Sequence, residues 1–293
     1  MDEDTEAVVF QSLFPNKIIL KDTIFENIIS KHFGFNTRLS LDIINSKFIN
    51  NYSMSGFLFY TQDFVYVENS FFSNTTTLFK GSKCKYEIVD TIFENFYIDT
   101  NIPVIIDSRF ASINITNSEF NNFKMMGSLF YEETKINLHN IKLNNVSTNS
   151  KGVIYSTFNN VQIDGLYAQD IICYGESGDS SIILFDSNTE IKELKINNIN
   201  ISNSFTNGPA IKITGISNEI YINNLNISNV KSYGPIIDNI SYKTISSFSN
   251  INLNNNINSD RLECGNIHLQ NDVTFYLNNS NFIGNINKGN GGV

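Results

Sequence analysis

The chain has 293 residues, of which 41% are hydrophobic and 17% charged, and its formal net charge is −9 at pH 7. The hydrophobic content and the low counts of glycine (16) and proline (4) exclude collagen-like and generically disordered chains. With 20 basic against 29 acidic residues and no cluster of lysine or arginine, the sequence argues against nucleic-acid binding.

The N-terminal segment differs from the rest of the chain. It begins with the acidic run Met1-Asp2-Glu3-Asp4, which is unlike the basic start of a signal peptide, and no stretch of eighteen apolar residues follows anywhere. We therefore expect no membrane span. Residues 1–16 precede the first repeat copy described below, and we predict that they cap its open end.

A repeat of the form apolar-x-apolar-x-Asn-x-x-apolar-x-Asn fills the rest of the chain. It is clearest over residues 41–50 and 65–74. The first Asn position of each copy, here called the anchor, occurs eleven times at intervals of 21 to 33 residues. The anchors are Asp22, Asn45, Asn69, Asp90, Asn117, Asn140, Gly165, Asn198, Asn224, Asn250 and Asn279.

Each copy opens with alternating apolar and polar residues, which predicts a short β-strand with one buried face. A second apolar strand follows, as at residues 56–59 and 152–155. Units of this size cannot close a core alone, so they must stack on one another. We predict an all-β fold over 17–293: a right-handed single-stranded parallel β-helix of about eleven coils, with handedness taken from the rule for parallel crossovers.

Stacking also gives the 47 asparagines a structural role. Equivalent side chains of successive coils would form columns, with Phe25, Phe48 and Phe72 inside and the anchors at a bend. A buried Asn is costly unless it is paired, so we expect the anchor amides to be buried and to hydrogen-bond from coil to coil. The chain stops at Val293 directly after a copy, which suggests a fragment of a longer array.

The unit Phe-x-Asn followed by Gly-x-apolar-apolar, as in Phe48-Ile49-Asn50 and Gly56-Phe57-Leu58-Phe59, resembles the repeats of chlamydial polymorphic outer-membrane proteins. It is also similar to the Asn-rich β-helix arrays of anaerobic gut fungi, including the non-catalytic scaffoldins of their cellulosomes. The resemblance covers roughly residues 17–287. It implies a secreted or cell-surface protein and, for the fungal arrays, dockerin modules of plant-cell-wall enzymes as partners.

Catalytic patterns of β-helix enzymes are missing from the sequence. Polygalacturonases carry Gly-His-Gly and Arg-Ile-Lys segments, and neither tripeptide occurs here. The three histidines fall in different coils, and no Cys/His spacing typical of a metal site exists. We therefore predict no enzymatic activity, no metal and no cofactor.

Three groups of residues are the candidate binding sites. Acids recur near the end of the second strand, where equivalents would form a stripe that could bind Ca²⁺ or a basic partner. Outward tyrosines of the first strand could stack on sugars or contact a protein. The longest interval contains an insertion, residues 174–181, and insertions in solenoids often lie on the binding face. These residues are Asp107, Glu132, Asp186 and Asp238; Tyr66, Tyr221 and Tyr276; and Glu176 and Asp179.

Two functions follow from these features. The first is a non-catalytic extracellular module that binds another protein, either for adhesion or for cohesin-like assembly of dockerin-bearing enzymes. The alternative is a β-helix that binds or degrades polysaccharide in the manner of pectate lyases. A cluster of carboxylates with a Lys or Arg in one groove would favour the alternative, whereas a flat Tyr and Asn face would favour protein recognition.

Overall fold

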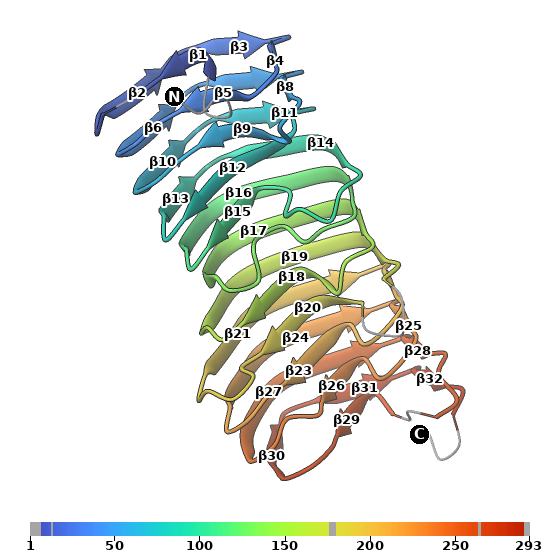
Figure 1. The fold of residues 1–293 in the computed structure, drawn as a ribbon. Coiled ribbons are helices and arrows are strands. Elements are labelled where there is room, and N and C mark those ends of the chain that lie inside the picture. The colour runs from blue at the N-terminus through green and yellow to red at the C-terminus, as the bar shows by residue number, and fades with distance from the viewer. Residues whose placement is uncertain (1–6, 13, 176–179, 263–264, 290–293) are drawn as a thin grey trace.

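The computed structural model describes residues 7–12, 14–175, 180–262 and 265–289. In this part of the chain all regular structure is β, no helix is present, and the strands stack into a parallel β-solenoid of about ten turns (Figure 1). The predicted fold class is thus confirmed. Eleven stacked first strands enclose ten complete turns, because each turn runs from one anchor to the next.

Each turn contains up to four strand segments. First strands carry the alternating pattern and second strands follow the anchor, although the two often run together. Short third strands come next, and return strands close the turn on a separate face.

The first strands, including the long merged ones, are β2 (Lys17–Lys21), β6 (Ser40–Ile44), β10 (Phe64–Glu68), β13 (Lys85–Val89), β16 (Ser112–Met125), β17 (Lys135–Thr148), β19 (Val161–Cys173), β21 (Glu193–Ser202), β24 (Glu219–Ser228), β27 (Thr244–Asn254) and β30 (Val273–Asn278). Separate second strands are β3 (Ile24–Glu26), β7 (Lys47–Ile49), β11 (Phe71–Ser73), β14 (Ile92–Ile98) and β31 (Asn281–Ile283). Third strands are β4 (Ile29–Ser30), β8 (Tyr52–Ser53), β22 (Phe205–Thr206), β25 (Lys231–Ser232), β28 (Ile257–Asn258) and β32 (Ile286–Asn287).

The return strands form two five-stranded sheets. One contains β1 (Ala7–Gln11), β5 (Phe33–Asn36), β9 (Phe57–Tyr60), β12 (Thr77–Ser82) and β15 (Ile106–Arg109), and the other contains β18 (Gly152–Thr157), β20 (Ser181–Asp186), β23 (Ile211–Thr214), β26 (Ile237–Asn239) and β29 (Ile267–Leu269). Strand β1, within the predicted cap, pairs in parallel with β5 through Phe10 and Phe35. Residues 7–11 thus stack on the return strand of the first turn, and capping by the whole segment 1–16 stays a prediction.

The anchors bend the chain by adopting a left-handed backbone conformation. All eleven have φ between 45° and 80°, and the residues five positions later form a second column with φ between 50° and 64°. Asn, Asp and Gly tolerate this conformation far better than other residues. The composition therefore reflects two bends per turn that only these residues make cheaply.

The anchor amides form the expected hydrogen bonds between turns but are not buried. Asn69 Nδ2 donates to Asn45 Oδ1 at 2.8 Å, and Asn140 Nδ2 donates to Asn117 Oδ1 at 2.8 Å, yet these anchors are exposed. We had expected the anchor amides to be buried and to need hydrogen bonds for that reason, and this expectation of burial was wrong. Backbone conformation selects asparagine, and the ladder bonds follow because equivalent side chains stack.

The predicted phenylalanine column runs through the core of the first half. Phe25, Phe48, Phe72, Phe93 and Phe120 stack nearly parallel, with ring centroids 4.9 to 5.4 Å apart. From Leu143 to Leu253 the column is aliphatic, and Phe282 follows in the last turn. The position one residue after the anchor changes in the opposite sense, from small polar residues such as Ser118 to Ile141 and its successors. Side chains become smaller in the first column where they become larger in the second, so the interior stays filled.

Backbone conformation and ladder hydrogen bond can be separated within β17. Asn140 and Asn144 each donate to the preceding turn at 2.8 Å, but only Asn140 has positive φ. We expect Asn140→Val to lower the free energy of unfolding by about 1–2 kcal/mol more than Asn144→Val, because a β-branched residue resists the left-handed region. Asn140→Gly should cost less than Asn140→Val. Equal losses in the two valine variants, measured by chemical denaturation, would assign the stabilisation to the amide bonds instead.

Candidate functional site

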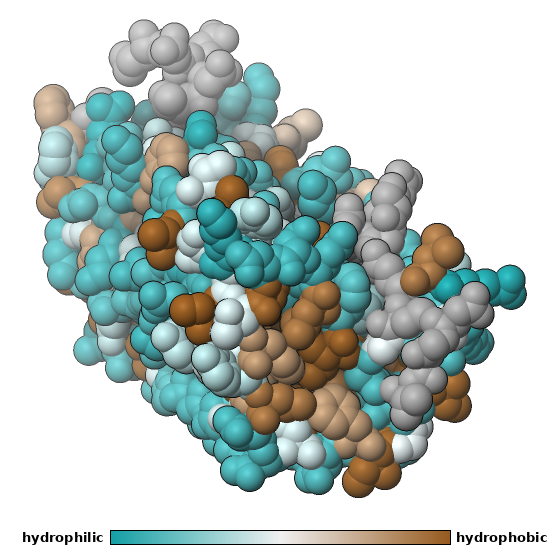
Figure 2. Space-filling model, turned by 90° about the horizontal axis from the view of Figure 1, so that it is seen from below, coloured by the Kyte–Doolittle hydropathy of each residue, from teal (hydrophilic) through white to brown (hydrophobic). Residues whose placement is uncertain are grey.

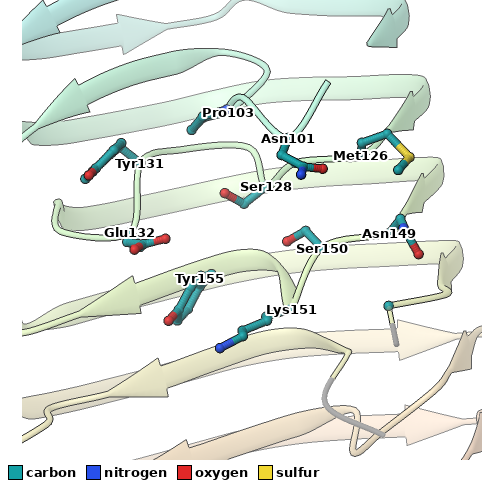
Figure 3. A pocket seen from close by; sticks show the side chains of 12 residues that line it. Asn101, Pro103, Met126, Ser128, Tyr131, Glu132, Asn149, Ser150, Lys151 and Tyr155 are labelled. Carbon is teal, nitrogen blue, oxygen red and sulfur yellow. The ribbon is translucent and has the colours of Figure 1, made fainter. Parts of the chain in front are cut away.

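A groove of about 640 Å³ lies where the chain enters the return strands in the middle of the solenoid (Figure 3). Successive turns contribute the ends of their third strands and the loops that follow. Its lining residues are Asn101, Pro103, Met126, Gly127, Ser128, Tyr131, Glu132, Asn149, Ser150, Lys151, Tyr155 and Gly175.

The groove coincides with the break between the two return sheets. Between β15 and β18, the intervening turn has no return strand and makes only a single bridge, from Phe130 to Ile106. Backbone hydrogen bonds still cross the break, for example from Leu129 N to Val153 O at 3.0 Å. The turn is therefore held in the stack, but its loop is free to depart from the strand path and leave a hollow.

Gly127 allows the loops to approach closely at this point. A Cβ atom on Gly127 would lie 2.3 Å from the carbonyl oxygen of Ile102, which is far inside van der Waals contact. Gly175 is similarly confined, since its Cβ would lie 2.6 Å from Ser150 O. The absence of side chains at these two positions sets the shape of the groove wall.

The two ends of the groove differ in chemistry. Figure 3 shows Tyr131, Glu132, Tyr155 and Lys151 toward one end, with Asn101 and Asn149 toward the other. Tyr131 and Tyr155 are half-buried. Phenol rings offer flat apolar area with a polar tip, and amides offer both donors and acceptors. The groove can thus hold an uncharged polar chain or a peptide.

Glu132 has an altered protonation equilibrium. Desolvation raises the pKa of its carboxyl, the neighbouring carboxylate of Glu133 raises it further, and Lys151 opposes both. Glu133 itself accepts hydrogen bonds from the guanidinium of Arg109, at 2.5 Å from Nε and 3.2 Å from Nη2. One carboxylate therefore faces the groove while its neighbour is held by an ion pair.

A second, mainly apolar pocket of about 250 Å³ adjoins the groove and shares Met126 and Asn149 with it. Tyr97 and Tyr174 are exposed on its rim, and Ile98 and Met125 also line it. Met125 is 3% exposed, so it forms a well-packed wall. The pair of cavities combines a polar groove with an apolar anchor pocket, the usual composition of a ligand site.

The predicted acids do not form one stripe. Asp107 and Asp238 occupy equivalent outward positions of the return strands, where Lys80 Nζ lies 2.5 Å from Asp107 and His268 Nδ1 lies 2.8 Å from Asp238. Asp186 is two residues further along its strand and accepts a hydrogen bond from the backbone N–H of Asn188 at 2.8 Å. Of these four acids, only Glu132 lines the groove.

The three predicted tyrosines share one column on the first strands. The strand registers place Tyr66, Tyr221 and Tyr276 at equivalent outward positions, and Ser247 separates the last two. Tyr66 lies six turns from Tyr221, so they do not form one site. Burial and Glu68 raise the pKa of the Tyr66 phenol. Tyr221 lines a separate hollow of about 430 Å³ with Asp164 and Lys195.

The first residues of the insertion lie beside the groove. Its first two residues, Tyr174 and Gly175, line the apolar pocket and the groove respectively. Glu176 and Asp179 lie outside the described residues. That the insertion borders a binding face stays a prediction.

Tyr131, Tyr155, Lys151 and Met126 were missed by sequence reasoning. Tyr131 and Tyr155 each follow the apolar run of the second predicted strand, in Leu129-Phe130-Tyr131 and Ile154-Tyr155. Aligning those runs as carefully as the anchors would have placed the two tyrosines together. The loop residues Met126 and Lys151 carry no such periodic signal.

Within the described ranges, no three His, Cys, Asp or Glu side chains come together in a way that could hold a metal ion. No helix there is long and apolar enough to cross a membrane. Searches of family models, curated proteins and solved structures found no match to the chain. The site must therefore be interpreted from its own geometry.

The close approach at Gly127 gives a first test of the groove wall. We expect Gly127→Ala to lower the free energy of unfolding by about 1–3 kcal/mol, because the new methyl group overlaps a backbone carbonyl that cannot move freely. Gly152→Ala is the control, since its nearest atoms would lie at 3.3 Å. Chemical denaturation of both variants measures the difference, and similar losses would contradict the proposed role of Gly127.

The raised pKa of Glu132 predicts a pH-dependent stability. An acid whose pKa is higher in the folded state binds protons more tightly there, so its contribution to stability falls as pH rises from the unfolded to the folded pKa. At pH of about 7 the Glu132 carboxylate is charged and costs stability, so Glu132→Gln should raise the melting temperature. At pH of about 4 the carboxyl is largely protonated, and the same substitution should change the melting temperature less. Glu133→Gln, which breaks the pair with Arg109, should lower it at neutral pH. A gain in both variants would contradict this assignment.

Proposed function

We propose that this chain is a non-catalytic binding module that recognises another protein through the groove and its adjoining apolar pocket. The observation that carries the proposal is the apolar pocket directly beside the polar groove, with Met126 shared by both. Protein interfaces are enriched in Tyr and Met, and their strongest contacts are apolar side chains inserted into pockets. An apolar side chain of a partner fits the pocket, and the following backbone fits the groove.

The chemistry of the groove supports an extended segment as the bound element. Amides of Asn101 and Asn149 can pair with the N–H and C=O groups of a peptide, and Glu132 and Lys151 can select charges at one end. Methionine adapts its shape to different side chains, so the pocket suits a family of related partners.

The resemblance of the repeats to surface-protein and scaffoldin arrays extends the proposal to its setting. We place the module in a secreted or cell-surface protein that serves adhesion or enzyme assembly. Within that setting, dockerin modules of plant-cell-wall enzymes are the concrete candidate partners. The stacked turns supply a rigid support, because each one is hydrogen-bonded to its neighbours.

A carbohydrate is the second candidate ligand, favoured by a separate observation. Tyr131 and Tyr155 lie at the same end of the groove, Ser128 lies between the two ends, and the amides of Asn101 and Asn149 lie toward the other end (Figure 3). Aromatic faces in the same groove as hydroxyl and amide groups suit a chain of sugar rings, which have apolar faces and polar edges. A carbohydrate would leave the apolar pocket without a bound group, and we therefore rank carbohydrate binding second.

A pair of methionine variants tests the proposal. We expect the purified chain to capture partners from the secreted proteins of its source organism, and Met126→Asp to weaken binding of an identified partner at least about tenfold by desolvating a charge in the apolar pocket. Met54→Asp is the control, because Met54 is 74% exposed and lines neither cavity. Calorimetry measures both affinities.

The carbohydrate alternative makes a different prediction for the same proteins. Binding on an oligosaccharide array that is lost in Tyr155→Ala but kept in Met126→Asp, with no protein partner captured, would overturn protein recognition. Equal affinity of the partner for Met126→Asp and Met54→Asp would also exclude the groove as its site.

A further inference from the structure

A second exposed surface runs along the third strands in the middle of the solenoid. Outward residues of these strands, and of the matching ends of the longer strands, form two columns over six successive turns. The first column is Tyr97, Lys124, Ser147, Ile172, Phe205 and Lys231. The second column is Asp99, Met126, Asn149, Tyr174, Asn207 and Tyr233. We call the two columns together the third-strand stripe. Figure 1 places β25 and β28 at the right-hand edge of the stack, and Figure 2, a view from below, shows hydrophobic residues exposed on that side.

Large apolar side chains are exposed on the stripe at regular intervals. Tyr97, Tyr174 and Tyr233 are 64%, 56% and 52% exposed, and Met126 is 37% exposed. The rings of Tyr174 and Phe205 approach each other from neighbouring turns, with centroids 6.5 Å apart. On the first-strand face of the same turns, the outward residues are mainly Asn, Gln, Ser, Lys and Glu. Contiguous exposed apolar surface is typical of an interaction site, so the stripe is the side of these turns best suited to a partner.

The spacing of the stripe favours an α-helix as the bound element. Neighbouring turns of the solenoid lie about 4.8 Å apart and one turn of an α-helix rises about 5.4 Å, so a helix laid along the stripe falls out of step by only about 0.6 Å per turn. An extended strand laid the same way presents same-side residues about 6.8 Å apart and falls out of step by about 2 Å. A helix with an apolar row can therefore meet every turn from Met126 to Tyr233.

Two lysines give the stripe a charge that a partner must match. Lys124 Nζ lies 5.1 Å from the ring centroid of Tyr97, and Lys231 Nζ lies 6.0 Å from that of Phe205. Among the described residues, neither ammonium group pairs with a carboxylate. The two lysines are four turns apart in their column, about 19 Å, a distance that roughly 11 to 14 residues of helix span while returning to the same side. Acidic residues at that spacing can pair with both lysines.

Charge also argues against a second copy of this chain as the occupant. Within the stripe the only acid is Asp99, so a dimer through this surface would bring four lysines together with two aspartates. The chain as a whole carries a net charge of −9, which adds a general repulsion between copies. An acidic segment of a different protein satisfies the lysines better.

We propose that the third-strand stripe binds an acidic amphipathic α-helix of the partner protein, which lies along the axis of the solenoid. Its apolar row packs on Met126, Phe205 and Tyr233, and acidic residues beside that row pair with Lys124 and Lys231. The inference rests on the proposed function, because the helix ends at the apolar pocket, from which the partner's chain continues into the groove. The stripe lies within the stack, so the contact does not depend on either end of the chain.

The test uses the full chain and three labelled synthetic peptides of about 18 residues, long enough for a helix of about 27 Å. The first has a leucine row at helical spacing flanked by glutamates. The second has lysines in place of the glutamates, and the third has the first composition with central prolines that prevent a helix. Fluorescence anisotropy measures the affinity of each peptide.

Two variants of the stripe are each compared with a matched variant elsewhere. Tyr233→Asp is matched by Tyr276→Asp, because Tyr276 is 55% exposed but lies on a first strand. Lys231→Glu is matched by Lys85→Glu, since Lys85 Nζ also lies over an aromatic ring, 5.5 Å from the centroid of Phe64, on the first-strand face. Circular dichroism and thermal unfolding confirm that each variant is folded.

Helix binding predicts a distinct result for each sample. The acidic helical peptide should bind the unmodified chain saturably, and the basic and proline-containing peptides should bind at least about tenfold more weakly. Tyr233→Asp and Lys231→Glu should each weaken the acidic peptide at least about tenfold, because each places a negative charge opposite its acidic flank. Tyr276→Asp and Lys85→Glu should leave its affinity unchanged.

Three outcomes would overturn the proposal. The first is no saturable binding of the acidic peptide up to about 1 mM, or equal binding of the proline-containing peptide. The second is self-association of the unmodified chain in sedimentation velocity that is lost in Tyr233→Asp, which would show that a second copy occupies the stripe. The third separates this inference from the proposed function: an identified partner that is weakened by Met126→Asp but not by Tyr233→Asp uses the pocket without a helix on the stripe.

Discussion

The structure depends on one backbone constraint, the left-handed conformation adopted at two fixed positions in every turn. Each such residue redirects the strand by a fixed amount, and the two are always five residues apart. Because the bends recur identically, equivalent strands lie over one another and their hydrogen bonds stay in register across the stack. The phenylalanine column and the amide ladders are consequences of that register, since stacked bends necessarily stack the side chains between them.

The interior tolerates changes in residue size as long as neighbouring columns compensate. Phenylalanine gives way to Leu143 and smaller aliphatics in the same turns where Ser118 is replaced by Ile141. These turns also contain the break between the return sheets and the groove beside it. The change of core composition and the irregular surface therefore occur together, which places the most distinctive cavity of the solenoid where its repetition is weakest.

The sequence predicted the features that recur and missed those that do not. Anchors, first strands and Phe48 in the core could be found because the same local pattern is repeated eleven times. The exposure of the anchors could not be predicted. A column of buried residues and a column of exposed residues recur with the same spacing in the sequence, so the spacing does not distinguish them. The groove was also out of reach, since Gly127 and Lys151 lie in loops whose lengths vary and whose meeting depends on the fold.

The charged residues show why recognition is expected at the irregular turns. On regular faces, side chains one turn apart are close enough to pair, and several do: Lys17 with Asp42, Lys80 with Asp107, and Lys142 with Glu119. In such pairs the charged groups bind each other across neighbouring turns, so fewer charged groups are left to bind a ligand. At the groove, the loops move the backbone away from the common path, and Glu132 is desolvated beside a second carboxylate. Irregularity thus provides what a perfect solenoid lacks, a concave surface lined by polar groups.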